Sequence, residues 1–385
     1  MLTIRITVIF ALMLLLISSS ARADSNSFPI APDGTRTNNR NATDEKQIAP
    51  TFGFNYFDPF IRLLHDPNDA SVEDDFKELH AHRVPFIRFA ACGYWPNEMR
   101  MYVDDPEQYL KRLDRIFALA EKYDIGLVPS LFWYRPTVPD LVGESCDQWG
   151  NKESKTHAFM RKYTTDIVRR YHNSPSLRGW ELGNEYNLDK DLPTDPSTLP
   201  AIVPTLGTPA VRTERDRLSH DGLVVALDEF ASAVRALDKV HFVTTGNAAP
   251  RASAWHLRNE KSWTSDSDEQ YAEMLLAENP SPFVISVHLY KEDLKRIESI
   301  GKVARQANRA LFIGEFQLED PRDRTLFDAI LQSMIRAETT MAAVWVYNLP
   351  SQKETFSVTA QNDRAYQLGA IRDMNDASRG VSKDR

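Results

Sequence analysis

The chain has 385 residues, a formal net charge of −8 and no basic block, so we expect no nucleic-acid partner. A hydrophobic fraction of 42% is enough for a large core, and the length fits either two average domains or one α/β barrel, which takes 250 residues or more. Aromatic residues make up 10% of the chain, which permits a sugar-binding cleft but equally suits a large core.

The first 50 residues differ from the rest of the chain. Residues 1–23 have the form of a secretory signal, with Arg5 before an apolar run at 8–17 and small residues at Ala21 and Ala23. The run is shorter than the ~20 residues of a membrane span, although an uncleaved anchor is the alternative. Residues 24–50 are polar, which predicts a disordered linker. We therefore expect a secreted or periplasmic protein that is free of the membrane after cleavage.

From residue 51 onward, strand-like runs alternate with helical patterns. The expected strands are residues 52–57, 86–90, 125–132, 180–183, 241–245, 283–289, 311–314 and 343–347. The expected helices are residues 71–83, 106–120, 154–171, 218–237, 271–277, 294–306, 324–338 and 363–374. Eight strands alternating with helices predict a single (β/α)8 TIM barrel over residues 51–375, with a C-terminal tail at 376–385. No Gly-rich phosphate loop follows a strand, which counts against a nucleotide-binding unit.

Two of these strands end in a glutamate. Asn184 and Glu185 follow the apolar run 180–183, and Glu315 follows the run 311–314. The carboxyl ends of barrel strands meet on one face, so residues 130 positions apart can come together there. Two facing carboxylates are the minimum equipment for glycoside hydrolysis, with one acid and one nucleophile or base. The alternative for Glu185 is a solvated charge at a strand end.

Other strand ends carry polar and aromatic residues. Arg88 would keep a neighbouring carboxylate ionised, or would be a salt-bridge partner at the barrel rim. His288 is a site residue or a core histidine, and Tyr290 faces the same way if the strand continues. Trp345 belongs to the core or forms the floor of a sugar site.

As a set, these residues resemble the glycoside hydrolase family 5 (cellulase-like) enzymes of the retaining (β/α)8 clan. The resemblance covers roughly residues 51–350 and rests on short motifs in the family's order. The matching residues are Arg88, the pair Asn184-Glu185, His288 with Tyr290, the triplet Gly314-Glu315-Phe316, and Trp345. The chain departs from the family's cellulases at the third strand, where Leu131-Phe132-Trp133-Tyr134 lacks the usual histidine, and residues 180–182 are more similar to β-mannanase-like members.

The resemblance implies a retaining hydrolase of a β-linked glycan, of the β-glucan or β-mannan class. Glu315 would be the nucleophile and Glu185 the acid/base, while Asn184 would bind the sugar's 2-hydroxyl. A carbohydrate is the expected partner, with no cofactor and no metal, and we expect a monomer. The alternatives are a non-catalytic carbohydrate-binding barrel and a transglycosylase. A metal-dependent hydrolase is disfavoured because the His80/His82 pair falls within an expected helix.

Two further expectations concern the loops. Cys92 and Cys146 follow the second and third strands, and a secreted chain with two cysteines favours a disulfide between them. The segment 189–209 and the region of Trp255 and Trp263 are longer than ordinary βα loops, so we expect them to wall the cleft.

Overall fold

The computed structural model describes residues 30–36, 50–290 and 294–378 of the chain. Within them, eight parallel strands form one sheet in the order β5-β4-β3-β2-β1-β8-β7-β6. The strands are β1 Thr51–Asn55, β2 Phe86–Ala90, β3 Gly126–Phe132, β4 Gly179–Gly183, β5 Phe242–Thr244, β6 Ile285–Leu289, β7 Leu311–Phe316 and β8 Met341–Val344. A single parallel bridge between Val243 and Phe283 closes the barrel between β5 and β6.

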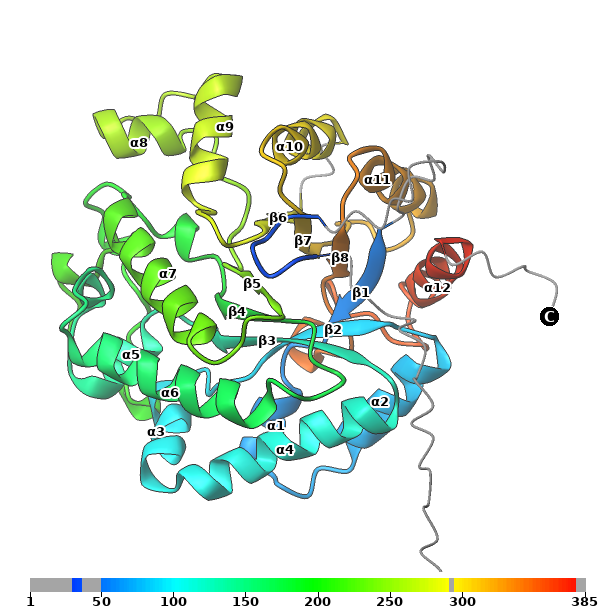
Figure 1. Cartoon of the computed structure of the whole chain (residues 1–385), viewed down its shortest axis with the longest axis horizontal. Coiled ribbons are helices and arrows are strands. Elements are labelled where there is room, and N and C mark those ends of the chain that lie inside the picture. Colours follow the sequence, from blue (N-terminus) through cyan, green and yellow to red (C-terminus); the bar gives the residue numbers. More distant parts are fainter. Residues whose placement is uncertain (1–29, 37–49, 291–293, 379–385) are drawn as a thin grey trace, which may run out of the picture.

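Helices surround this barrel (Figure 1). Those in the described residues are α1 Pro59–His65, α2 Ser71–Ala81, α3 Pro96–Asp104, α4 Pro106–Lys122, α5 Thr137–Val142, α6 Lys155–Tyr171, α7 His220–Arg235, α8 Ala254–Glu260, α9 Asp268–Ala277, α10 Leu294–Gln306, α11 Arg324–Arg336 and α12 Tyr366–Ser378. The start of α4 shows how the sequence sets a boundary. Asp105 accepts a hydrogen bond from the Gln108 N–H at 3.0 Å, and Pro106 occupies the first helical position. The eight-stranded parallel barrel and its surrounding helices confirm the predicted TIM barrel.

Several element boundaries differ from the sequence expectation. Strand β8 ends at Val344, so Trp345 comes directly after the strand rather than within it. Strand β7 extends to Phe316, so Glu315 lies within the strand and not after it. The short helices α1, α3, α5 and α8 were missed because each sits inside a βα loop and is too short for a clear apolar periodicity.

Residues 30–36 are ordered, which differs from the disordered linker predicted for residues 24–50, whereas residues 24–29 and 37–49 of that linker lie outside the described residues. Ile30 is buried in one cluster with Phe86, Phe242 and Phe312, at the end of the barrel opposite the strand carboxyl ends. The Gly34 carbonyl accepts a hydrogen bond from the Ala310 N–H at 2.9 Å, and the segment lies beside β6 in Figure 1. The segment contains an isoleucine that packs in the core and a Pro-Asp-Gly turn that reverses the chain, although its overall composition is polar.

The C-terminal helix also extends beyond its expected end. Helix α12 runs to Ser378, and Asp376 pairs with Arg83 at 2.8 Å, so the first residues of the expected tail are helical. No helix in the described part of the chain has the length and apolar character needed to cross a membrane. The predicted signal peptide at residues 1–23 lies outside the described residues.

Candidate active site

Arg88, in the middle of β2, is the centre of the polar network at the carboxyl ends of the strands. Its side chain is fully buried. Nε and Nη2 bind the Glu181 carboxylate at 2.8–2.9 Å, Nη1 donates to Asn55 at 2.9 Å and to Glu315 at 2.7 Å, and Nη2 donates to Asn184 at 2.8 Å. All five donors of the guanidinium are used, so one side chain fixes residues from β1, β4 and β7.

Glu315 is held by hydrogen bonds on both carboxylate oxygens. Arg88 binds Oε1, and the Tyr290 hydroxyl donates to Oε2. Burial and the charge of Glu315 raise the pKa of Tyr290 well above its ordinary value, so the phenol keeps its proton. The preceding Gly314 presents its carbonyl to Asn55 Nδ2 at 2.9 Å. This arrangement holds the Glu315 carboxylate in one orientation.

Glu185 occupies a different environment, directly after β4. Its backbone is left-handed, with φ of 56°, and its N–H donates to the Gly246 carbonyl at 2.8 Å. The turn brings the carboxylate within 3.0 Å of His288 Nδ1. Burial raises the pKa of Glu185 above its ordinary value, although the nearby Arg88 opposes the shift. The two glutamates thus have unequal surroundings, and burial favours the protonated form of Glu185.

His288 lies between the two glutamates. Its Nδ1 is 3.0 Å from Glu185 Oε1 and 3.5 Å from Glu315 Oε1, and burial lowers the pKa of the imidazole to about 3. A neutral ring can donate one Nδ1 proton toward both carboxylates. One oxygen of Glu185 and one of Glu315 lie within 4.8 Å of each other. This closeness suits the retaining geometry, in which the carboxyl groups are about 5–5.5 Å apart.

Glu185, His288 and Glu315 are also close enough to share a metal ion. The Glu315 oxygens are, however, already bound by Arg88 and Tyr290, and a guanidinium beside the site repels a cation. The expectation of no metal therefore stays a prediction.

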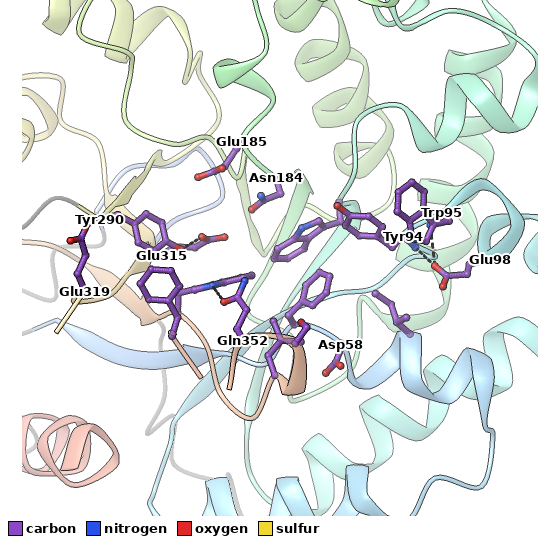
Figure 2. Close-up of a pocket in the computed structure, with 17 residues that line it drawn as sticks. Asp58, Tyr94, Trp95, Glu98, Asn184, Glu185, Tyr290, Glu315, Glu319 and Gln352 are labelled. Atoms are coloured by element: carbon purple, nitrogen blue, oxygen red, sulfur yellow. Dashed lines mark hydrogen bonds between the residues drawn. The ribbon is translucent and has the colours of Figure 1, made fainter. Parts of the chain in front are cut away.

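A cavity of about 690 Å³ lies over these groups (Figure 2). Its walls come from the segments after β1, β2, β3, β4, β6, β7 and β8. The lining residues are Phe57, Asp58, Ile61, Tyr94, Trp95, Glu98, Trp133, Asn184, Glu185, Tyr290, Glu315, Glu319, Trp345, Leu349, Ser351, Gln352 and Phe356. The Trp133 and Trp345 rings are 28° from parallel with centroids 6.1 Å apart, and the Arg88 guanidinium lies 4.3 Å from the Trp133 ring centre. Cavities of about 300–1,000 Å³ hold drug-sized ligands.

The structure brings together all seven residues expected from the sequence. Arg88, Asn184, Glu185, His288, Tyr290 and Glu315 form one contact network, and Trp345 lines the same cavity, with its indole N–H bonded to Gln352 at 2.8 Å. Sequence reasoning missed the part played by Glu181, a fully buried partner of Arg88. The sequence feature that could have indicated this role of Glu181 is the arginine inside an expected buried strand, because a buried positive charge needs anionic partners.

The predicted disulfide is wrong, because Cys92 and Cys146 are both free and buried. The Cys92 sulfur accepts a hydrogen bond from the Trp133 N–H at 3.2 Å, whereas Cys146 begins a 3-10 helix, Cys146–Gly150. Burial raises the pKa of both thiols to about 12, so both are poor nucleophiles. Cys92 and Cys146 were expected to pair because their loops are neighbours, but neighbouring loops do not bring every pair of side chains together.

The prediction that segment 189–209 and the two tryptophans wall the cleft is also wrong. None of these described residues lines the cavity. The segment packs on α3, where Asn97 donates to the Thr205 carbonyl at 3.0 Å. Trp263 is 58% exposed, and Trp255 donates to Glu273 at 3.2 Å in the α8–α9 region, which projects from the barrel (Figure 1).

Comparison with known proteins places this site in a family context. The family model described as Cellulase (glycosyl hydrolase family 5) matches residues 43–349. A probable mannan endo-1,4-beta-mannosidase F from Aspergillus flavus is 27% identical over 140 residues, which is 31% of this chain and 30% of that protein. A mannan endo-1,4-beta-mannosidase F from Aspergillus clavatus is 33% identical over 82 residues, 20% of this chain and 19% of that protein. The chain thus aligns with less than a third of the length of these curated relatives.

Solved structures with the same fold include two mannanases. The hyperthermostable endo-1,4-beta-D-mannanase from Thermotoga petrophila superposes with a TM-score of 0.60 at 14% identity, over 84% of this chain and 99% of that one. The endo-1,4-beta-mannanase from Rhizomucor miehei gives 0.58 at 15% identity, over 91% and 99%. At these identities the likeness establishes the barrel fold.

Proposed function

Because this chain belongs to glycosyl hydrolase family 5, we propose that it is a retaining β-glycosidase that hydrolyses β-1,4-linked glycans of the mannan class. The single observation that carries the proposal is the unequal pair of carboxyls. Glu315 is bound by Arg88 and Tyr290, and Glu185 is bound by a neutral His288, with one oxygen of each glutamate within 4.8 Å of the other. The mannan class is supported by the names of the relatives and by residues 180–182.

Glu315 attacks the anomeric carbon in the first step. It is suited to this because both its oxygens accept hydrogen bonds, which hold the carboxylate in one orientation. As its charge passes to the new ester bond, the Tyr290 and Arg88 donors remain in place, so little reorganisation is needed. The product of this step is a covalent glycosyl-enzyme.

Glu185 supplies the proton for the leaving oxygen, which its raised pKa favours. In the second step it removes a proton from the water that attacks the glycosyl-enzyme. His288 keeps the Glu185 carboxyl oriented through Nδ1. The Asn184 oxygen is occupied by Arg88, which turns the amide and leaves its N–H groups for the 2-hydroxyl of the sugar.

The test is a comparison of wild type, Glu185→Ala and Glu315→Ala on soluble β-mannan, β-glucan, xylan and an aryl β-mannoside. We expect the highest kcat/KM on β-mannan, and a loss of about 10³-fold or more on mannan for each variant, because removing one member of a catalytic pair costs several orders of magnitude. Near wild-type turnover by both variants would leave the alternative, a carbohydrate-binding barrel. Products longer than the substrate supplied would identify a transglycosylase.

We further propose that the protein is exported to the periplasm or medium and acts there as a monomer. The support is the leader-like composition of residues 1–23 and the sugar-binding character of the site. Detection of a chain shortened by about the length of that leader outside the cytoplasm, with one barrel mass by light scattering, tests both statements. An uncleaved chain in the membrane fraction would contradict them.

A further inference from the structure

The two glutamates of the proposed mechanism are held in different ways. Glu315 lies within β7, and Arg88 and Tyr290 bind its carboxylate. Glu185 comes after the end of β4, and His288 is the one hydrogen-bond partner of its carboxylate among the described residues. Its backbone is left-handed, with φ of 56°, which is unfavourable for a residue other than glycine and persists only where surrounding contacts fix it. The position of the acid/base therefore depends on what holds this turn.

Asn187, two residues later, joins the turn after β4 to the turn after β5. Its amide nitrogen donates to the Ala248 carbonyl at 2.9 Å, and its amide oxygen accepts a hydrogen bond from the Ala248 N–H at 3.0 Å. The Glu185 N–H donates to the Gly246 carbonyl at 2.8 Å. The Asn187 amide thus takes the place of a backbone peptide and continues the pairing of β4 with β5 beyond both strand ends. Together these hydrogen bonds hold the turn that contains Glu185 against the turn after β5.

A buried ion pair fixes the Asn187 amide. Asn187 Nδ2 also donates to Glu278 Oε2 at 2.5 Å, and Lys190 Nζ lies 3.1 Å from Glu278 Oε1. All three residues are buried, at 3% exposure or less. Glu278 directly follows α9, and its backbone carbonyl accepts a hydrogen bond at 2.7 Å from Asn247, in the turn after β5. Hydrogen bonds to a charged acceptor are among the strong ones, so the Asn187 amide is held in one orientation.

Asn187, Lys190 and Glu278 do not line the cavity, so no effect of theirs on catalysis passes through contact with the sugar. We propose that Asn187 is a positioning residue for the acid/base: its amide, fixed by the buried ion pair, holds the turn after β4 and so places the Glu185 carboxyl. The inference rests on the proposed glycosidase function. Without the Asn187 amide the proton reaches the leaving oxygen less readily, whereas attack by Glu315, which other residues hold, is unchanged.

The test uses the leaving group to separate proton donation from nucleophilic attack. A phenyl β-mannoside needs protonation of its leaving oxygen, whereas a dinitrophenyl β-mannoside does not, and kcat/KM reports the first step for both. For Asn187→Ala we expect kcat/KM on the phenyl substrate to fall about 10- to 100-fold, since a displacement of about 1 Å can have such an effect. On the dinitrophenyl substrate it should stay within about threefold of the wild type. Equal losses on the two substrates, or no loss on either, would overturn the proposal.

Asn375→Ala is the matched control, because Asn375 joins another part of the barrel with the same pair of hydrogen bonds. Its amide nitrogen donates to the Phe52 carbonyl at 2.9 Å, and its amide oxygen accepts from the Phe52 N–H at 3.0 Å. It is similarly buried, at 4% exposure, but it joins α12 to β1, and neither residue lines the cavity. Asn375→Ala should lower Tm, as Asn187→Ala does, and should change kcat/KM on the two substrates by the same factor. A leaving-group dependence in this control as large as that of Asn187→Ala would count against a specific role of Asn187.

A double variant tests whether Asn187 acts through Glu185. In Glu185→Ala, the addition of Asn187→Ala should change kcat/KM on either substrate by less than about threefold, because the group to be positioned is already gone. A further loss of about tenfold or more would contradict that route. If Asn187→Ala does not fold, Glu278→Gln decides, since it keeps the side-chain size and an acceptor oxygen but removes the charge. It should lower kcat/KM about 3- to 10-fold on the phenyl substrate alone, and equal losses on both substrates would then refute the role of Asn187.

Crystal structures separate this inference from the proposed function. If the wild type cleaves aryl glucosides or xylosides rather than mannosides, the same comparison is made with those substrates. If it cleaves no glycoside, the proposed function fails, and the turn itself is compared between wild type and Asn187→Ala. A shift of the Glu185 carboxyl by about 1 Å or more, with loss of its contact with His288, would support the positioning role. An unchanged turn would contradict it.

Discussion

Replacing Glu181 by glutamine tests the buried network on which the site depends. Its carboxylate has no exposed surface and binds Arg88 Nε at 2.9 Å and Nη2 at 2.8 Å. Glutamine keeps the size, but it removes the charge and presents an N–H₂ group to one of these donors. Arg88 is then balanced only by Glu315.

The expected loss of stability is about 3–5 kcal/mol, the usual cost of removing one partner of a buried ion pair. A barrel of this size loses roughly 2 °C in Tm per kcal/mol, so Tm should fall by roughly 6–10 °C. Activity should fall as well, because the same guanidinium positions Glu315 and Asn184. A displacement of about 1 Å in such a group can reduce the rate about 100-fold.

The assay is thermal and urea unfolding of the wild type and Glu181→Gln, together with kcat on β-mannan at a temperature where both are folded. Glu107→Gln is the control, because Glu107 is exposed and its contact with Arg170 is 3.6 Å long. Its stability should change by less than about 0.5 kcal/mol. A loss below about 1 kcal/mol in Glu181→Gln, with kcat intact, would refute the central place given to this pair.

Three other predictions follow from the surroundings of single groups. Burial raises the pKa of Asp58 from 3.8 to about 6. Between these pH values Asp58 is more protonated in the folded than in the unfolded state, so its ionisation lowers the free energy of unfolding as the pH rises, with the full effect above about pH 6. Asp58→Asn should therefore raise the free energy of unfolding at pH 7 by about 1–3 kcal/mol and leave it unchanged below about pH 4. Urea unfolding at the two pH values measures this, and a loss of stability at pH 7 contradicts it. Gly314→Ala would place a Cβ 2.8 Å from His288 Nε2, which should displace the ring and lower kcat about 10- to 100-fold, whereas unchanged kcat would show that the ring position is unimportant. Because the pKa of Glu185 is raised, kcat/KM on mannan should fall as pH rises through that pKa. An aryl glycoside whose leaving group needs no protonation should not show this fall in kcat/KM at high pH. The same pH dependence of kcat/KM for both substrates would argue against Glu185 as the acid.

The sequence was informative wherever position in a barrel determines what a residue does. Glu185, Glu315 and Arg88 could be placed together because the strand ends of a barrel share one face, whatever their separation along the chain. Trp345 was found by the same reasoning, although β8 ends at Val344, three residues before the expected end of that strand.

Side-chain direction could not be predicted in the same way. Glu181 alternates with apolar residues in β4, and only the three-dimensional barrel shows that it faces Arg88. The left-handed backbone at Glu185 and the inward sulfur of Cys92 depend on tertiary contacts with Gly246 and Trp133. Loop length was misleading for residues 189–209, because a long loop can pack over α3 as easily as over a cleft.

The central claim is that Glu315 carries the sugar and Glu185 moves the proton. It is tested most directly by mass spectrometry of proteolytic peptides from Glu185→Ala after brief reaction with an activated aryl β-mannoside. Without the acid/base, the first step still proceeds with a good leaving group, and the second is slow, so the glycosyl-enzyme should accumulate. The account predicts a mass increase of one mannosyl unit on the peptide that contains Glu315, and on no other peptide. Attachment to a different residue, or turnover without any labelled peptide and with inversion of the anomeric carbon, would contradict it.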